Sequence, residues 1–372
     1  MSLPTTMNAI VVDGKRPVLK SGLPLPNLEK GTLLLKTKSV AARISDWKIL
    51  DYNLGPQGSI IGADVVGEIV KSGDGVDTTQ FKIGDNVFGF VHGANFNTPD
   101  NGGFADYVAL DSKLAFKLDD KVGFSDEKTL NEGPITTFEG AATVPCSWIT
   151  AGATLFHHIK LKFEWEPKQP QIGRPVLVWG GATGLGQAVI QLLKKVHGFT
   201  KIVVVASKKH EQLLKSYGAD EIFDYHDKDV IKQIKTKYNN FSWLIDCVSS
   251  PDTFNQVYQC SPDGMTSTVF NFMMMNNDSV KPEYRKDTVK LDDAMVYSST
   301  GVEYRLGDSV FPADPEYRTD VTNFVKFINA HFIDGSLRHN PVKIYKGLDN
   351  VVQMLDDLKA NSNSGDRYVV DV

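Results

Sequence analysis

The sequence predicts an α/β protein in which a doubly wound parallel sheet accompanies a separate β-rich domain. Three observations predict this fold class. Glycine-punctuated β-type runs fill residues 7–140, strand-like and helix-like segments alternate from residue 147, and a glycine-rich turn follows the first strand of that alternation. At 372 residues, the chain is long enough for two domains that each have a core.

Short β-type runs dominate the first part of the chain. They are separated by turns and occur at residues 8–12, 31–42, 62–73, 84–91 and 103–110. This texture is typical of a compact, barrel-like β domain, which we expect to occupy residues 1–146.

From residue 147 the pattern alternates between strands and helices. Apolar runs predict strands at 176–180, 201–207, 221–225, 243–250, 267–273 and 294–300. Amphipathic segments predict helices at 188–196, 210–218 and 229–238. Such an alternation predicts a parallel sheet with helices on both faces, over residues 147–305. We interpret Met273, Met274 and Met275 as apolar packing.

The tail of the chain changes pattern again. Amphipathic helices are expected at 316–335 and 348–361, with strands near 340–346 and 367–372. We expect residues 306–372 to pack back on the β domain.

The glycine-rich turn lies in VLVWGGATGLGQ, residues 176–187. Its glycines would let the backbone turn sharply and approach a ligand, while the amides of the following helix attract an anion. Thr183 stands where the middle glycine of GxGxxG would be, so an ordinary strand-to-helix turn is the alternative. The predicted pyrophosphate cradle comprises Gly181, Ala182, Thr183, Gly184 and Leu185, with Gly186 completing the turn.

The tip of the second strand of this unit indicates which nicotinamide coenzyme binds. An NAD-binding unit places an acid there, whereas this chain has Ser207, Lys208 and Lys209. A carboxylate would repel a 2′-phosphate, but hydroxyl and ammonium groups bind it through charge-assisted bonds of about 1.5–3 kcal/mol. The pattern therefore favours NADPH through Ser207 and Lys208. The alternative is that the lysines begin a solvated helix.

Composition and charge exclude several classes of partner. The 40 basic and 45 acidic side chains give a net charge of −5 without a basic tract, so neither nucleic acid nor an anionic membrane is expected. The first residues lack a signal-peptide pattern and no apolar run could span a bilayer, so we expect a cytoplasmic location. Cys146, Cys247 and Cys260 are too widely spaced for a disulfide framework or a CxxC lobe.

The order of these parts resembles the medium-chain dehydrogenase/reductase superfamily. The segments that carry the resemblance include GADVVGEIV, KIGDNVFGF and GGFADYVAL. Other segments resemble the zinc-independent quinone oxidoreductase branch, which includes fungal ToxD-like trans-enoyl reductases and NADPH-dependent aldehyde reductases: Asp46–Lys48, Gly55–Gly58, residues 144–152 and Phe223–Asp227. The resemblance implies a GroES-like catalytic domain, a Rossmann domain that binds NADPH, and a cleft between them.

The resemblance also bears on metal. Zinc-dependent members hold a catalytic ion with a cysteine, the histidine of a GHE motif and a later cysteine. The corresponding positions here are Arg43, the segment Gly62–Asp64, and Cys146. One thiol cannot hold zinc, so no metal is expected and Cys146 is interpreted as a small buried residue. Hydrogen-bond donors and cations would then have to polarise a carbonyl.

Further site residues follow from the same resemblance. Ser45 and Lys48 align with a proton relay, Lys48 also reaching a ribose hydroxyl, and Thr150 resembles a threonine that faces nicotinamide and substrate. Tyr52 is a weaker candidate for the proton donor. Tyr225 is expected against the adenosine phosphate and Val248 against a ribose through its backbone.

Each catalytic candidate also has an ordinary structural interpretation. Lys48 would lie on a solvated helix face, Ser45 would cap a helix that begins at Asp46, Thr150 would be an interior hydroxyl, and Tyr52 would be a packing residue.

The sequence thus predicts a cytoplasmic, zinc-independent reductase that transfers hydride from NADPH to a small aldehyde. The alternatives are an enone, quinone or trans-enoyl reductase and, from another class, a non-catalytic NADPH-binding sensor or scaffold. A monomer and a homodimer both stay open. Relatives pair through an edge strand of the nucleotide sheet, which we expect near residues 295–300.

Overall fold

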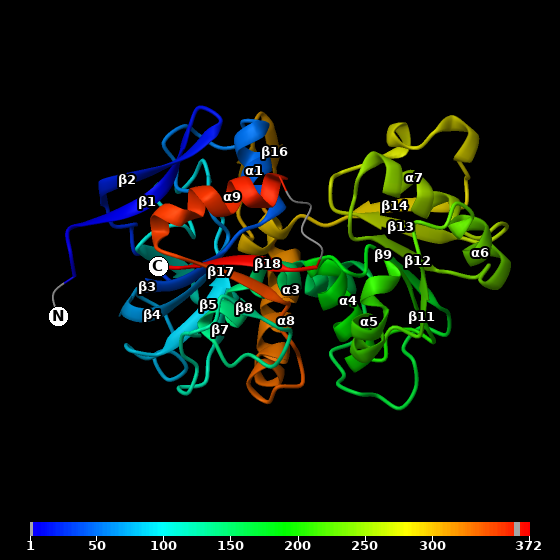
Figure 1. The fold of residues 1–372 in the computed structure, drawn as a ribbon, viewed down its shortest axis with the longest axis horizontal. Helices are drawn as coiled ribbons and strands as arrows, with labels where there is room; N and C mark the ends of the chain where they lie inside the picture. Colours follow the sequence, from blue (N-terminus) through cyan, green and yellow to red (C-terminus); the bar gives the residue numbers. More distant parts are fainter. Residues whose placement is uncertain (1–2, 361–364) are drawn as a thin grey trace. The chain divides into compact units, whose positions relative to one another are not determined.

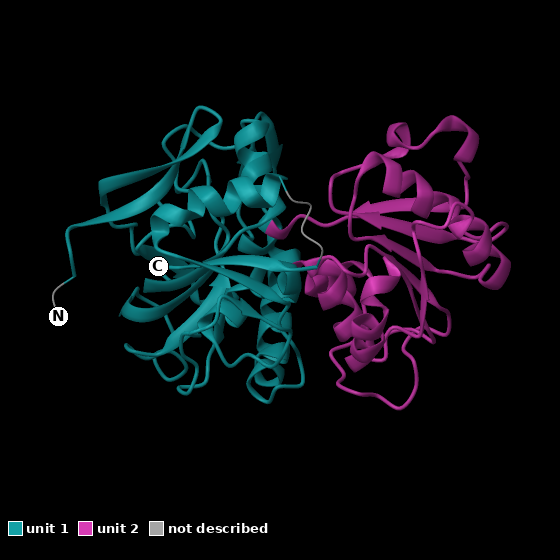
Figure 2. Ribbon diagram, viewed as in Figure 1, with its two compact units in different colours: residues 1–149, 297–372 teal, residues 150–296 magenta. Residues whose placement is uncertain are grey.

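The computed structural model describes residues 3–360 and 365–372. The chain divides into two compact units, one made of residues 1–149 and 297–372 and the other of residues 150–296 (Figure 2). The boundaries therefore lie at 149/150 and 296/297, where the sequence suggested 146/147 and 305/306. We call these parts unit 1 and unit 2.

Unit 1 is built on a curled, mainly antiparallel sheet of eight strands. The strand order is β7-β5-β4-β3-β18-β17-β8, with β6 also paired to β3. The bounds are β3 Thr32–Ala41, β4 Asp64–Ser72, β5 Asn86–Phe90, β6 Tyr107–Asp111, β7 Ala115–Lys117, β8 Thr129–Leu130, β17 Val342–Lys346 and β18 Arg367–Asp371. Two hairpins join it: β1 Thr6–Asp13 with β2 Arg16–Pro24, and β15 Tyr304–Leu306 with β16 Ser309–Phe311.

The C-terminal tail pairs with the N-terminal β domain. Strand β18 pairs antiparallel with β3, so that Val369 lies opposite Ala41. Helix α9 lies beside α1 (Figure 1), and Lys359 pairs with Asp51 at 2.6 Å. The helices of unit 1 are α1 Ile44–Asp51, α2 Phe138–Ala142, α8 Pro315–Ile333, α9 Val351–Ala360, and α3 Pro145–Gly152, which runs into unit 2. The last residue of the predicted helix 348–361, Asn361, lies outside the described residues.

Strand β2 was not predicted, for a physical reason. Most of its side chains are exposed, and it contains Pro17 and Gly22. Proline is tolerated in an edge strand, where its missing amide costs no ladder bond, but apolar periodicity cannot reveal such a strand.

Unit 2 is a doubly wound sheet of six parallel strands in the order β11-β10-β9-β12-β13-β14. The apolar runs form strands because both of their faces are covered. Residues of α4 and α5 pack on the face that carries Val204, and those of α6 and α7 on the face that carries Leu177 and Val203. The bounds are β9 Val176–Trp179, β10 Ile202–Val205, β11 Glu221–Phe223, β12 Trp243–Asp246, β13 Ser267–Asn271, β14 Val289–Asp293, α4 Gly184–Lys195, α5 Glu211–Tyr217, α6 Val230–Lys237 and α7 Pro251–Gln259.

The strand predicted at 294–300 is wrong. Residues Val296–Thr300 form a 3₁₀ turn, and Arg318 fixes it by donating to the carbonyls of Ser299 and Thr300 at 3.2 and 3.0 Å. The edge strand is β14 instead, so the expected pairing edge near 295–300 moves to Val289–Asp293.

The prediction that the methionine run is apolar packing is wrong for two of its three residues. Met273 and Met274 are exposed, whereas Met275 packs against the core of unit 2. Asn271 sets this turn by accepting hydrogen bonds from the amides of Met273 and Met275 at 3.0 and 2.9 Å. These hydrogen bonds fix the turn, and Met273 and Met274 are exposed on it although their side chains are apolar.

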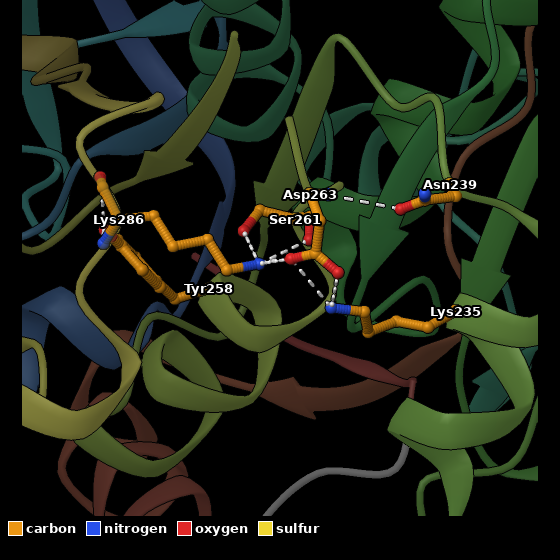
Figure 3. Close-up of polar contacts among 6 residues, drawn as sticks. All are labelled: Lys235, Asn239, Tyr258, Ser261, Asp263 and Lys286. Carbon is orange, nitrogen blue, oxygen red and sulfur yellow. Dashed lines mark hydrogen bonds and ion pairs between the residues drawn. The ribbon is translucent and has the colours of Figure 1, made fainter. Parts of the chain in front are cut away.

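A charged cluster lies where β12, β13 and β14 begin. Figure 3 shows Asp263 between Lys235 and Lys286. The Nζ atoms of Lys235 and Lys286 lie 3.1 and 2.8 Å from the carboxylate oxygens of Asp263. Lys286 also donates to the carbonyl of Ser261 at 2.8 Å. Because the residues of this cluster precede the strands, it lies at the amino edge of the sheet, opposite the glycine turn, and we assign it to stability.

Candidate functional site

The glycine turn joins the carboxyl end of β9 to α4, and its glycines are required by close packing. Gly180 has a φ of +78°, and a Cβ there would lie 2.5 Å from Val248 Cγ2. A Cβ on Gly181 would lie 2.3 Å from Val204 Cγ1, and one on Gly186 would lie 2.3 Å from the carbonyl oxygen of Gly180. Gly180, which the sequence analysis did not select, carries the positive φ, while Gly181 and Gly186 let strand, turn and helix approach one another.

The start of α4 presents backbone amides. Thr183 caps the helix, because its Oγ1 accepts from the amide of Gly186 at 2.9 Å. Over the chain segments that the structure describes, the amides of Ala182, Gly184 and Leu185 donate to no protein acceptor. The N-terminus of a 12-residue helix with such amides attracts an anion such as a pyrophosphate.

The tip of β10 carries the residues predicted to select the coenzyme. Ser207 precedes the short 3₁₀ turn Lys208–His210, in which no side chain is buried. The amide of Lys208 donates to Asp224 Oδ2 at 3.2 Å. An acid therefore does lie at this edge, contributed by the end of β11. Sequence reasoning missed it because it inspected only the tip of β10.

Two further predicted contacts lie at the same edge of the sheet. Tyr225 follows β11 and is 49% exposed, and Val248 follows β12 and is 44% exposed. Buried Asp246 holds the Val248 turn by accepting from the amides of Val248 and Ser249, each at 3.0 Å. Burial raises the pKa of Asp246 to about 6.

These positions share one feature of the parallel sheet. The residues Gly181–Leu185, Ser207, Lys208, Tyr225 and Val248 follow the carboxyl ends of β9, β10, β11 and β12, neighbouring strands of unit 2. In open α/β sheets, ligands bind at this edge.

Helix α1 carries Ser45 and Lys48, two of the predicted catalytic residues, in unit 1. The helix begins at Ile44 after Arg43, so the interpretation of Ser45 as a cap is wrong. Lys48 is half-buried, and burial lowers the pKa of its ammonium. Tyr52 is the C-cap that follows the helix, and it is 63% exposed.

Tyr297 and His92 were not selected from the sequence. The Tyr297 ring stacks on the ring of His92 with centroids 4.2 Å apart. Burial raises the pKa of Tyr297, and a hydrogen bond with Ser45 partly opposes that rise. Both ring nitrogens of His92 are buried without a partner in the described part of the chain, and burial lowers its pKa to about 3. No sequence signal singled them out, because the pair forms only when distant segments meet.

Thr150 lies in the last turn of α3 and is 8% exposed. Its carbonyl accepts from Thr154 Oγ1 at 2.9 Å. Thr150 belongs to unit 2, whereas Ser45, Lys48 and Tyr52 belong to unit 1.

A buried ion pair forms in unit 1 at the positions compared with zinc ligands. The guanidinium of Arg43 binds Asp64 and donates to Ser147 Oγ at 2.9 Å, while the amide of Cys146 donates to Asp64 Oδ1 at 2.8 Å. Burial alone would lower the pKa of Arg43, but the charge of Asp64 raises it above its ordinary value. Arg367 adds a second cation 3.9 Å from Asp64.

These residues do not fit a zinc ion. A catalytic zinc ion needs three protein ligands, and Arg43 offers none at its position. The fixed positive charge of Arg43 would repel a divalent cation, and Asp64 is already bound to that guanidinium.

Comparisons with known proteins match both units. The model of the alcohol dehydrogenase GroES-like domain matches residues 29–120, and that of the zinc-binding dehydrogenase matches residues 184–303. Among the described residues, no helix combines the length and apolarity needed to cross a bilayer.

Individual relatives extend over nearly the whole chain. An uncharacterized protein of Saccharomyces cerevisiae is 48% identical over 98% of this chain and 99% of its own length. A trans-enoyl reductase of Aspergillus niger is 30% identical over 99% of this chain and 97% of its own length.

Solved structures share the fold at low identity. An alcohol dehydrogenase superfamily protein of Novosphingobium aromaticivorans has a TM-score of 0.73 at 17% identity, covering 99% of this chain and all of its own. The quinone oxidoreductase of Coxiella burnetii has a TM-score of 0.65 at 21% identity, covering 99% of each chain.

Proposed function

The chain belongs to the medium-chain dehydrogenase/reductase superfamily, and we propose that it is an NADPH-dependent reductase that acts on a small activated electrophile without a catalytic metal. The observation that carries the proposal is the carboxyl edge of the unit 2 sheet. There the amides of Ala182, Gly184 and Leu185 lie around the start of α4, and Ser207 and Lys208 follow the neighbouring strand.

These residues fit a phosphorylated dinucleotide. The α4 amides would bind the pyrophosphate, Ser207 and Lys208 the 2′-phosphate, Tyr225 the adenosine phosphate, and the Val248 backbone a ribose. When bound, NADPH supplies the hydride.

The protein must then manage one proton and the charge that develops on the substrate. We assign this task to Ser45 and Lys48 of α1, with Thr150 near the nicotinamide and Tyr52 as the weaker candidate. The lowered pKa of Lys48 supports the assignment, because an acid nearer to neutrality transfers a proton more readily.

An activated alkene is the substrate that this chemistry favours. Conjugate reduction spreads the developing negative charge into an enolate. The enolate oxygen is less basic than the alkoxide formed when a simple aldehyde is reduced, so it needs weaker stabilisation by the protein. The trans-enoyl reductase of Aspergillus niger supports the same choice. Reduction of a small aldehyde, the activity preferred from the sequence, stays the second candidate.

One substrate distinguishes the two activities. A short α,β-unsaturated aldehyde contains both reducible bonds, and the product would be identified after NADPH consumption. A saturated aldehyde indicates reduction of C=C, whereas an allylic alcohol indicates reduction of C=O and would overturn our choice. Binding of NADPH without turnover of enals, enones, quinones or saturated aldehydes would support the sensor instead.

A further inference from the structure

The ends of β10 and β11 are joined by a side chain beyond the last backbone pair. The register runs Val203–Glu221, Val204–Ile222 and Val205–Phe223, and the amide of Ala206 then donates to the carbonyl of Phe223 at 3.0 Å. After this point β10 turns into the 3₁₀ segment Lys208–His210. The next amide bonded across the pair is that of Lys208, and its acceptor is the carboxylate of Asp224.

Both oxygens of Asp224 are engaged by protein donors. Oδ2 accepts from the amide of Lys208 at 3.2 Å. Oδ1 accepts from the amide of His226 at 3.0 Å and from its Nδ1 at 2.7 Å. These hydrogen bonds, led by that of the His226 amide, lower the pKa of Asp224, so the group stays a carboxylate.

Asp224 thereby controls the two segments that flank it. It fixes the backbone where Lys208 begins its turn, and it fixes the backbone on the far side of Tyr225. The His226 ring, held by the same oxygen, lies 4.1 Å from the Tyr225 ring between centroids. Lys208 and Tyr225 are both predicted phosphate contacts, and neither is buried in the core.

We propose that Asp224 is the positioning residue of the 2′-phosphate site: it binds no coenzyme itself but holds Lys208 and Tyr225 at the spacing that a 2′-phosphorylated adenosine requires. This inference rests on the proposed use of NADPH and names the residue that makes the chain selective for it.

A competing role for this acid predicts the opposite result. In NAD-binding units an acid accepts from the ribose hydroxyls and repels a 2′-phosphate. If Asp224 acted in that way, its removal would improve NADPH binding and weaken NADH binding. Because its oxygens already serve Lys208 and His226, we expect the reverse.

The test compares Asp224→Ala with a matched control at the other end of the same strand. Asp220 precedes β11 and its Oδ2 accepts from the amide of Ile202, where β10 begins, at 2.7 Å. Asp220→Ala therefore removes a similar bond between the same two strands, but at the amino edge of the sheet. The measurements are dissociation constants for NADPH, NADH, 2′,5′-ADP and 5′-AMP by calorimetry on the full chain.

We expect Asp224→Ala to weaken NADPH and 2′,5′-ADP by about tenfold, the scale of one lost hydrogen bond, and NADH and 5′-AMP by less than about twofold. Asp224→Asn retains one acceptor oxygen and should recover part of the loss. Asp220→Ala should leave the NADPH-to-NADH ratio unchanged.

Three outcomes would overturn the inference. The first two are that Asp224→Ala leaves the ratio of NADPH to NADH affinity unchanged, or shifts it toward NADPH. The third is that Asp220→Ala lowers this ratio as much as Asp224→Ala does. If the unaltered protein binds 5′-AMP or NADH but neither NADPH nor 2′,5′-ADP, the proposed coenzyme is wrong. That result is distinct from a failure confined to Asp224.

Discussion

Arg43 shows how one substitution changes the chemistry available to this fold. A guanidinium that is 7% exposed replaces a possible metal ligand, and it joins α1, β4 and the start of α3 through Asp64 and Ser147. The resemblance indicated that Arg43 stands where zinc-dependent members have a ligand. It could not predict the ion pair, because the partner lies on a different strand and its burial depends on the assembled core.

Replacing Arg43 should therefore cost stability. Arg43→Met leaves Asp64 buried with only the more distant cation of Arg367, 3.9 Å away, and should lower the free energy of unfolding by about 3–5 kcal/mol. The control is Lys38→Met, because Lys38 pairs with Glu68 of the same strand β4, at 3.1 Å and near the surface. That variant should lose at most about 1 kcal/mol in urea unfolding. Equal losses for the two variants would show that the buried pair is not a structural element.

Asp46 makes the stability of this region depend on pH. Burial raises its pKa to about 7, although its carboxylate accepts from the amide of Arg43 at 2.7 Å. A carboxyl group whose pKa is higher in the folded state than in the unfolded state, about 3.9, contributes its full stabilisation of the fold at pH values below the unfolded pKa. This stabilisation is lost as the pH rises through the folded pKa.

The unaltered protein should thus lose on the order of 2–3 kcal/mol relative to Asp46→Asn between about pH 5 and pH 7, and little more above about pH 8. Comparing the two proteins cancels the titration of other buried groups. Urea unfolding at several pH values measures the difference. A difference that stays constant over this range would show that Asp46 is ionised in the folded protein throughout.

At the scale of elements, the glycine turn is the feature that the sequence revealed best, yet for partly different reasons. The spacing predicted strand, turn and helix. From the sequence we expected Gly181 and Gly186 to let a ligand approach the backbone closely. In the structure, their missing side chains instead make room for Val204 and for the carbonyl of Gly180. Contacts of this kind are invisible before the strands are placed beside one another.

A methyl group at Gly186 tests that packing. In Gly186→Ala the new Cβ would lie 2.3 Å from the backbone oxygen of Gly180, which cannot move without distorting the turn. We expect a loss of about 1–3 kcal/mol in unfolding free energy and weaker NADPH binding. Gly173→Ala is the control in the same unit, since its Cβ would meet nothing within 4 Å. If Gly186→Ala behaves like this control, the turn is less tightly packed than described.

The errors at this scale share a cause. The run at 294–300 has the composition of a strand, but hydrogen bonds from Arg318 set it as a turn. Strand β2 escaped notice because most of its side chains face solvent. Apolar periodicity predicts buried elements well. It fails where a single tertiary bond or an exposed edge decides the backbone.

At the scale of the whole molecule, the order of parts was the strongest signal. A β domain, a nucleotide-type domain and a returning tail were expected, and β18 pairs with β3 across most of the sequence. Residues 297–372, which return to unit 1, also supply Tyr297 and Arg367, and no local pattern could predict their contacts. Contacts between residues that lie far apart in the sequence are therefore the part of this region that could not be predicted from the sequence.

The proposed reaction uses NADPH for reduction without a catalytic metal. Its most direct test is the initial rate of NADPH consumption with an α,β-unsaturated aldehyde, measured before and after exhaustive removal of metal by a chelator. We expect the same rate in both samples and no gain when Zn²⁺ is added back. A rate that disappears with the metal and returns with stoichiometric Zn²⁺ would contradict it.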